Sequence, residues 1–158
     1  MKRIIVLITI FLLSNSSLDS QSKFVYSAVD KLRKISSNRL PASINDLIAV
    51  SDGTRNTKEQ LIIQYVNDKI ILAQKNIDWN IHNIIFFYHT SEEAKPLMIK
   101  RMKTLNAYIE DIANTISIEM GYANNRQTVY IGNDAKNLLR DAVEIIKLVI
   151  IEFENEID

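Results

Sequence analysis

The chain has 158 residues, of which 47% are hydrophobic and 24% are charged, with three Gly, two Pro and no Cys. This composition excludes collagen-like, disulfide-stapled and low-complexity disordered proteins. Nineteen Lys and Arg balance nineteen Asp and Glu. The chain therefore lacks the excess positive charge with which proteins bind nucleic acid, and we expect no nucleic-acid partner.

The first twenty residues have the pattern of a secretory signal peptide. Lys2 and Arg3 precede an apolar stretch over residues 4–13, and small polar residues follow it. The apolar stretch is about half as long as a bilayer-spanning helix. We therefore expect residues 1–20 to be removed, with an uncleaved start as the alternative, and residues 21–158 to form one exported domain, in the periplasm or outside the cell. The expected cleavage positions follow Ser16, Ser17 or Ser20.

Residues 23–35 carry apolar side chains three and four positions apart, which predicts an amphipathic helix capped by Ser22. Pro41 disfavours helical geometry at the residue before it, so this helix is expected to break at residues 38–41. Residues 43–50 then predict a short extra helix, closed by a turn at residues 51–53.

The segment from Thr57 to Gln60 has the form of a capping box, and apolar residues continue behind it at helical spacing as far as Tyr88. This pattern predicts one continuous helix over about residues 58–89. A break at residues 76–78 is the alternative. Trp79 is expected to seal the middle of this helix rather than to stack on a ligand.

A second capping box at residues 90–93, with Pro96 in the first turn, predicts the start of the third helix. Gly121 is expected to end it. The apolar residues between these points step by four, three, four, three and four, a narrow seam typical of a left-handed bundle. They are Met98, Met102, Leu105, Ile109, Ile112 and Ile116.

Residues 121–133 are expected to form a long loop, and residues 135–154 the last helix, with a wide apolar face. Leu148 and Ile151 project into its polar side. We expect the first helix or the segment 43–50 to cover them, and a partner or dimer contact is the alternative.

Together these elements predict an all-α, single-domain, up-and-down four-helix bundle with a short extra helix between the first and second long helices. Two charge clusters support antiparallel packing of the last two helices, because each lies at the unfavourable end of its own helix dipole. Cross-helix pairing would offset that cost. The basic cluster is Lys95, Lys100, Arg101 and Lys103, and the acidic cluster is Glu152, Glu154, Glu156 and Asp158.

Motifs for catalysis or cofactor binding are almost absent from the sequence, and we expect neither enzyme activity nor a cofactor. There is no Gly-rich phosphate loop, no His-Glu-x-x-His and no acidic calcium loop. Ser20 and Lys23 match Ser-x-x-Lys without its companion motifs. A haem-binding bundle is disfavoured because Met98, Met102 and Met120 all fall in one helix, and the first and last helices carry no His.

The two histidines, His82 and His89, are seven residues apart, about 10.5 Å along a helix, which is too far for a shared zinc ion. Asp78 precedes the first by four residues, and Glu93 follows the second by four. Ordinary carboxylate-histidine pairing is the expected role of these four residues. A weak metal site completed by a neighbouring helix is the alternative.

The predicted 121–133 loop combines Tyr, Arg and amide side chains, the residue types in which interfaces concentrate binding energy. Its candidate protein-binding residues are Tyr122, Asn125, Arg126, Gln127 and Tyr130, to which we add Leu148 and Ile151. The competing interpretation is that the Tyr rings only cover the end of the bundle.

The sequence is therefore interpreted as an exported, non-catalytic protein-binding module, immunity-type or adaptor-like, whose partner is another protein. A homodimer is compatible with this hypothesis. The alternative function is a carrier of a small apolar ligand or metal within the bundle. A membrane-acting helical protein is a further hypothesis, which requires the last helix to turn its apolar face outward.

Overall fold

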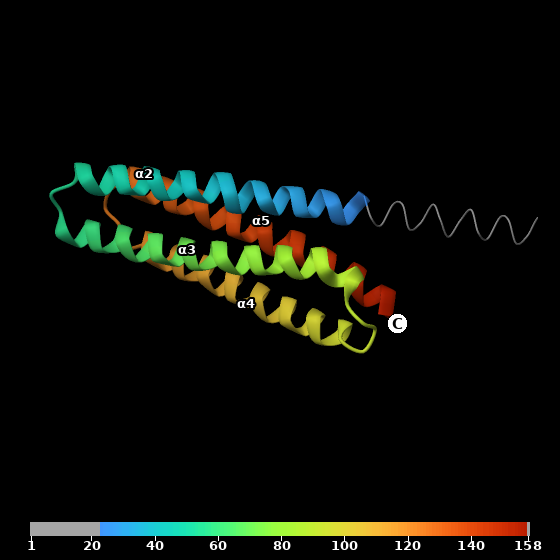
Figure 1. The fold of residues 1–158 in the computed structure, drawn as a ribbon. Coiled ribbons are helices and arrows are strands. Elements are labelled where there is room, and N and C mark those ends of the chain that lie inside the picture. Colours follow the sequence, from blue (N-terminus) through green and yellow to red (C-terminus); the bar gives the residue numbers. More distant parts are fainter. Residues whose placement is uncertain (1–22, 158) are drawn as a thin grey trace, which may run out of the picture.

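A computed structural model describes residues 23–157, which form a bundle of four long helices and contain no strand (Figure 1). The predicted signal peptide, the expected cap Ser22 and the acidic residue Asp158 lie outside the described residues. The first long helix runs over residues 23–53 and includes a π-helical turn, η1 (Ile35–Arg39), and the segment α2 (Leu40–Gly53). The others are α3 (Thr57–Phe86), extended by the 3₁₀ turn η2 (Phe87–His89), α4 (Lys95–Met120) and α5 (Arg126–Ile157).

Successive helices run in opposite directions, as the up-and-down topology predicts. The α2–α3 and α4–α5 connections lie at one end of the bundle (Figure 1). The α3–α4 connection lies at the other end, together with residue 23 and the C-terminal turn of α5. Neighbouring helices in this order pack along their lengths, and α2 also packs against α5, which closes the bundle.

The predicted break at residues 38–41 is wrong, and so is the separate short helix at residues 43–50. The chain remains helical through Pro41, which lies in the first turn of α2. The π turn before it absorbs the disturbance, with the Leu40 N–H bonding to the Ile35 carbonyl five residues earlier. A wider turn at this point accommodates the proline ring and its missing N–H without ending the helix.

α3 is continuous, so the first prediction for this helix is confirmed and the break at residues 76–78 is wrong. Its cap differs from the predicted capping box: the Asn56 side chain accepts hydrogen bonds from the backbone N–H groups of Lys58 and Glu59. The Gln60 side chain donates to the carbonyls of Ser51 and Thr54 in the preceding turn. The side-chain amide of Asn56, one position before the predicted cap Thr57, therefore caps the helix.

α4 begins later than the predicted capping box, because residues 91–94 form a turn and no side chain caps the helix. Thr90 instead donates to the Phe86 carbonyl at 2.9 Å. The predicted seam faces the interior, with Met98 and Leu105 half-buried and the rest buried, and Gly121 is the C-cap as predicted.

α5 begins at Arg126, so the long loop at residues 121–133 is wrong. The Asn125 side chain accepts from the Gln127 backbone N–H at 2.8 Å and so caps the helix. Thr128, Ile131 and Gly132 have low helix propensity, but all three are buried against the bundle. Packing therefore extends the helix where local preference predicts a loop.

Gly132 permits the close approach of α4 and α5. A Cβ at this position would lie 2.0 Å from the sulfur of Met120 and 2.8 Å from its Cγ. Since Met120 is itself buried, only a residue without a side chain fits here beside it.

The core is an apolar column of mainly Ile, Leu, Val and Ala, with Phe87 and Phe153 stacked at one end at a ring distance of 3.7 Å. Four buried asparagines interrupt it, three of them on α3: Asn67, Asn80 and Asn83. On α4, Asn106 donates to the Val143 carbonyl of α5 at 3.2 Å. The wide apolar face predicted for α5 is confirmed.

The predicted antiparallel contact between the two charge clusters is confirmed by the pair Lys103 and Glu154, whose Nζ and Oε1 atoms are 2.5 Å apart. Lys95 pairs instead with Glu92 in the α3–α4 connection. None of the helices within residues 23–157 combines the length and the apolar character that a membrane span requires.

Candidate functional site

The end of the bundle that holds the α2–α3 and α4–α5 connections is tied together by one buried carboxylate. Glu59, in the first turn of α3, is 2% exposed. Its Oε2 accepts a hydrogen bond from the Asn124 backbone N–H at 3.0 Å. This contact joins the start of α3 to the turn before α5, and it fixes that turn to a rigid part of the fold.

The predicted binding residues of the α4–α5 region lie on this fixed end. Tyr122 is in the turn and Asn125 is the cap of α5, whereas Arg126, Gln127 and Tyr130 lie in the first turns of the helix rather than in a loop. Tyr122 and Tyr130 are 59% and 75% exposed. The alternative in which the Tyr rings cover the bundle end therefore does not describe their position.

A shallow hollow of about 290 Å³ adjoins these side chains. Asn125 and Gln127 line it from the α5 side, and residues 49, 50, 53 and 54 at the end of α2 line it from the other. We define the bundle-end surface as Tyr122, Asn125, Arg126, Gln127 and Tyr130 together with this hollow. It offers aromatic faces, a guanidinium and amide groups to a binding partner.

Leu148 and Ile151 belong to a different surface. Both are about half exposed on the outer side of α5. The expectation that the first helix or residues 43–50 would cover them is wrong, because those segments pack on other sides of α5. Eighteen residues separate Tyr130 from Leu148, about 27 Å along the helix. The predicted site residues thus fall on two separate surfaces.

The histidines lie on the outward side of α3 and at its end. The His82 ring packs between Trp79 and Phe86, at ring distances of 5.9 and 4.4 Å. Asp78 accepts a hydrogen bond from Ser36 of the first helix at 2.5 Å. Across residues 23–157, no three His, Asp or Glu side chains gather closely enough to hold a metal ion. Trp79 is 58% exposed, so it does not seal the helix from solvent as expected.

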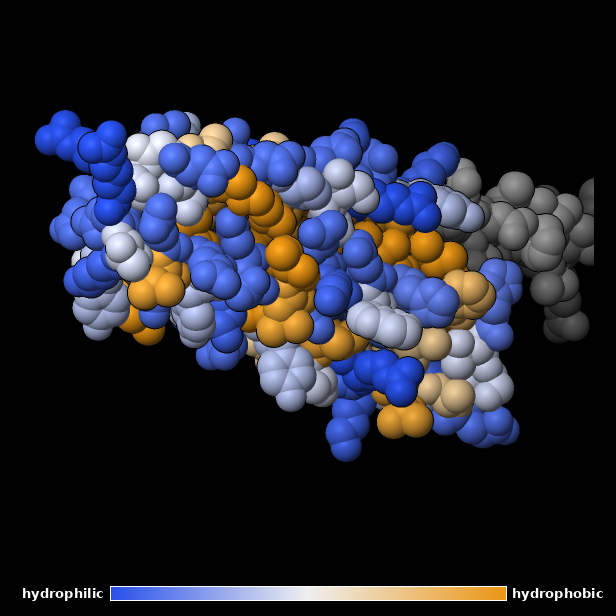
Figure 2. Space-filling model, turned by 60° about the vertical axis from the view of Figure 1, so that its left-hand side comes forward, coloured by the Kyte–Doolittle hydropathy of each residue, from blue (hydrophilic) through white to orange (hydrophobic). Residues whose placement is uncertain are grey.

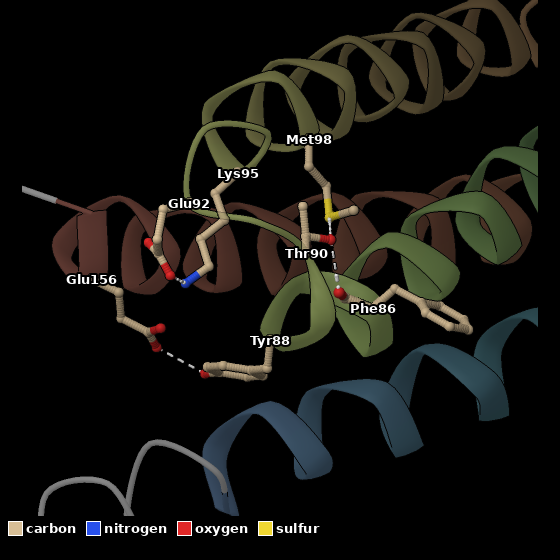
Figure 3. Close-up of polar contacts among 7 residues, drawn as sticks. All are labelled: Phe86, Tyr88, Thr90, Glu92, Lys95, Met98 and Glu156. Atoms are coloured by element: carbon tan, nitrogen blue, oxygen red, sulfur yellow. Dashed lines mark hydrogen bonds and ion pairs between the residues drawn. The ribbon is translucent and has the colours of Figure 1, made fainter.

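Two polar side-chain pairs lie at the opposite end of the bundle (Figure 3). Tyr88 donates to Glu156 at 2.8 Å, and Lys95 pairs with Glu92 at 2.6 Å. Partial burial raises the pKa of Tyr88 well above its usual value, and the carboxylate of Glu156 adds to this effect. Figure 3 shows the Phe86 ring pointing away from these pairs.

Sequence reasoning missed an apolar surface along α3. Tyr65, Leu72, Trp79 and Phe86 follow one another at intervals of seven residues, and each is between 42% and 58% exposed. On the face drawn in Figure 2, apolar side chains reach the surface in bands between polar ones, also toward the end where residue 23 lies. The seven-residue interval can be read from the sequence, but the apolar residues of α3 that face the core have a similar spacing and were the ones taken into account.

A partly apolar hollow of about 290 Å³ lies between the first helix and the end of α3. The residues that line it are Val25, Tyr26, Val29 and Arg33 of the first helix and Ile84, Ile85, Tyr88 and His89 on the other side.

Comparison with models of protein families, with curated proteins and with solved structures finds no match to this chain.

Proposed function

We propose that this protein is an exported, non-catalytic protein-binding module, immunity-type or adaptor-like, that binds its partner through the bundle-end surface. The observation that carries the proposal is the exposure of Tyr122, Arg126 and Tyr130 on the turn before α5 and its first helical turns, next to the backbone that the buried Glu59 holds in place. Tyr and Arg are the residue types most enriched among binding hot spots. A fixed backbone beneath them reduces the entropy lost on binding.

Export is the part of the proposal that rests on residues 1–20, whose basic start and apolar stretch have the pattern of a signal peptide. N-terminal sequencing of the protein recovered from the periplasmic or culture fraction tests it. We expect the mature chain to begin after Ser16, Ser17 or Ser20. A protein retained in the cytoplasm with its first residues intact would contradict export.

The binding surface is tested by placing a photo-crosslinking residue at Tyr130 in the source cells and identifying the captured protein by mass spectrometry. A crosslinker at Tyr108, which is 57% exposed on α4, is the matched control. We expect a partner captured from position 130 and not from position 108. Equal capture at both positions would indicate non-specific contact.

Affinity for the identified partner is then measured with purified proteins. Substituting Tyr122, Arg126 and Tyr130 with Ala removes the proposed hot-spot side chains, for which losses of about 2–4 kcal/mol are typical, or roughly 30- to 1,000-fold in Kd. Circular dichroism of the variant checks that its helix content is unchanged. Undiminished affinity would exclude the bundle-end surface as the binding site.

The second candidate function, carriage of a small apolar ligand, is favoured by the partly apolar hollow between the first helix and α3. Its volume of about 290 Å³ is near the lower limit for a ligand pocket. A saturating fatty acid should raise the melting temperature, and Val29→Trp, which fills the hollow, should abolish that shift. An unchanged melting temperature of the unsubstituted protein would rule out this function.

A further inference from the structure

The outward side of α3 carries a second heptad pattern, on the side of the helix opposite its core residues. At 100° per residue, core residues such as Val66 and Ile77 lie about half a turn away from it. The pattern advances by alternating steps of four and three residues over about 37 Å of helix. We define the outer α3 seam by its members: Leu61, Tyr65, Asp68, Leu72, Lys75, Trp79, His82 and Phe86.

The spacing of the outer α3 seam indicates a helical partner. A stripe that repeats every seven residues drifts by about 20° per repeat on a straight helix, and it stays in contact only with another helix that winds around it. The seam covers nearly four heptads, and from Tyr65 onward its apolar residues alternate with Asp68, Lys75 and His82. Its apolar members are 42–62% exposed, so no helix among the described residues covers this seam.

The charges within the seam identify the partner and its direction. Asp68 and Lys75 lie four residues before and three residues after Leu72, near the middle of the seam. Two copies packed antiparallel about a two-fold axis near Leu72 bring Asp68 of each copy close to Lys75 of the other. Parallel packing would place Asp68 against Asp68 and Lys75 against Lys75, and it is disfavoured by like-charge repulsion.

The aromatic residues have the same symmetry. Tyr65 and Trp79 lie seven residues on either side of Leu72, so antiparallel packing sets the Tyr65 ring of one copy beside Trp79 of the other. The formal net charge of the chain is zero, so two copies approach without overall repulsion. We propose that the outer α3 seam is a self-association surface on which a second copy of this chain packs antiparallel.

The first test is the oligomeric state of the mature protein in analytical ultracentrifugation. We expect a monomer–dimer equilibrium, accompanied by a blue shift of the emission of Trp79, the single Trp of the chain. Leu72→Arg sets two cations against each other at the two-fold axis and should raise the dimer dissociation constant at least about 100-fold. Tyr108→Arg is the matched control, since Tyr108 is 57% exposed on α4, compared with 47% for Leu72.

The second test determines direction, and the lack of native Cys makes it direct. In antiparallel packing, a mixture of Tyr65→Cys and Trp79→Cys chains should form a disulfide between copies, whereas each variant alone should not. Asp68→Lys should weaken the dimer, and adding Lys75→Asp should restore it. Both results depend on the pairing and not on the folding of a single chain.

Three outcomes would overturn the inference. A protein that stays monomeric up to about 1 mM excludes self-association and leaves the outer α3 seam to a helix of another protein. A dimer that is insensitive to Leu72→Arg uses a different surface. If the Tyr65→Cys protein alone forms as much disulfide between copies as the mixture of the two variants does, the packing is parallel. Because this surface is separate from the bundle-end surface, loss of the dimer and loss of partner binding are independent results.

Discussion

Gly132 should be the least replaceable glycine of the chain, because the Met120 side chain of α4 occupies the space that a Cβ would need. A Cβ at this position would lie within 3.0 Å of three atoms of the Met120 side chain, at 2.0, 2.8 and 3.0 Å. The whole side chain must therefore move, and it is buried. Overpacking of this kind costs about 1–3 kcal/mol, whereas replacing Gly by Ala within a helix gains about 1 kcal/mol. We expect Gly132→Ala to lower the free energy of unfolding by up to about 2 kcal/mol.

A double-mutant cycle with Met120→Ala isolates the contact. Met120→Ala alone should cost about 2–5 kcal/mol through the cavity it leaves. In that background Gly132→Ala should become stabilising, because the clash is gone and the new methyl group fills part of the cavity. Urea unfolding followed by circular dichroism gives each free energy, and the m-value should not change.

Gly53→Ala is the matched control, since a Cβ at Gly53 meets no atom within 4 Å. We expect it to be neutral or stabilising by up to about 1 kcal/mol. The reasoning would be refuted if Gly132→Ala stabilised the protein equally with and without Met120, because the two residues would then be independent.

Three further predictions concern polar contacts. Glu59→Ala leaves the Asn124 N–H without its acceptor and should lower the free energy of unfolding in urea by about 1–3 kcal/mol. Glu59→Gln keeps an acceptor and should lower it by less. Equal losses in the two variants would contradict the hydrogen bond. Lys103→Glu and Glu154→Lys should each lose about 0.2–1 kcal/mol at low salt, and the double swap should recover it, while additive losses would exclude the pair. The pKa of Tyr88 is higher in the folded protein than in the unfolded chain, so the unfolded chain loses this proton first as the pH rises. The contribution of Tyr88 to stability is therefore complete below a pH of about 10 and is lost at higher pH. Tyr88→Phe should therefore flatten the alkaline fall in stability, and an identical fall in both proteins would refute this.

The parts of the fold that depend on apolar periodicity were predictable from the sequence. The continuous α3 and the seam of α4 follow from side chains at three- and four-residue steps, and the bundle follows from their number and length. The antiparallel arrangement of α4 and α5 could be predicted from charge, because Lys103 and Glu154 lie at opposite ends of their own helices.

The errors occurred where packing overrides local preference. Pro41 predicts a break, but a single wider turn accommodates it, and local rules do not anticipate a π turn. The segment before Gly132 predicts a loop, yet contact with Met120 is what favours glycine there. Both corrections depend on residues far apart in the sequence or on backbone geometry that side-chain patterns do not specify.

The candidate surfaces were predictable only in part. Tyr122 and Tyr130 were chosen by residue type and are exposed, but the fixed turn beneath them depends on Glu59, sixty-five positions from its partner Asn124. The outer α3 seam was within reach of the sequence, because a helix with two apolar stripes must leave one of them outside a four-helix bundle.

The π turn of the first helix inserts one extra residue without changing which side of the helix faces the core. Ile35 and Leu40 are both buried although five residues separate them, and a π turn aligns such positions whereas an α turn aligns residues four apart. Deleting one residue between them would restore ordinary α-helix, in which Pro41 would lose the wider turn that accommodates it, so the deletion should be tolerated only when Pro41 is replaced as well. The same deletion in the middle of α3 would rotate half of that helix by about 100° and expose its buried side.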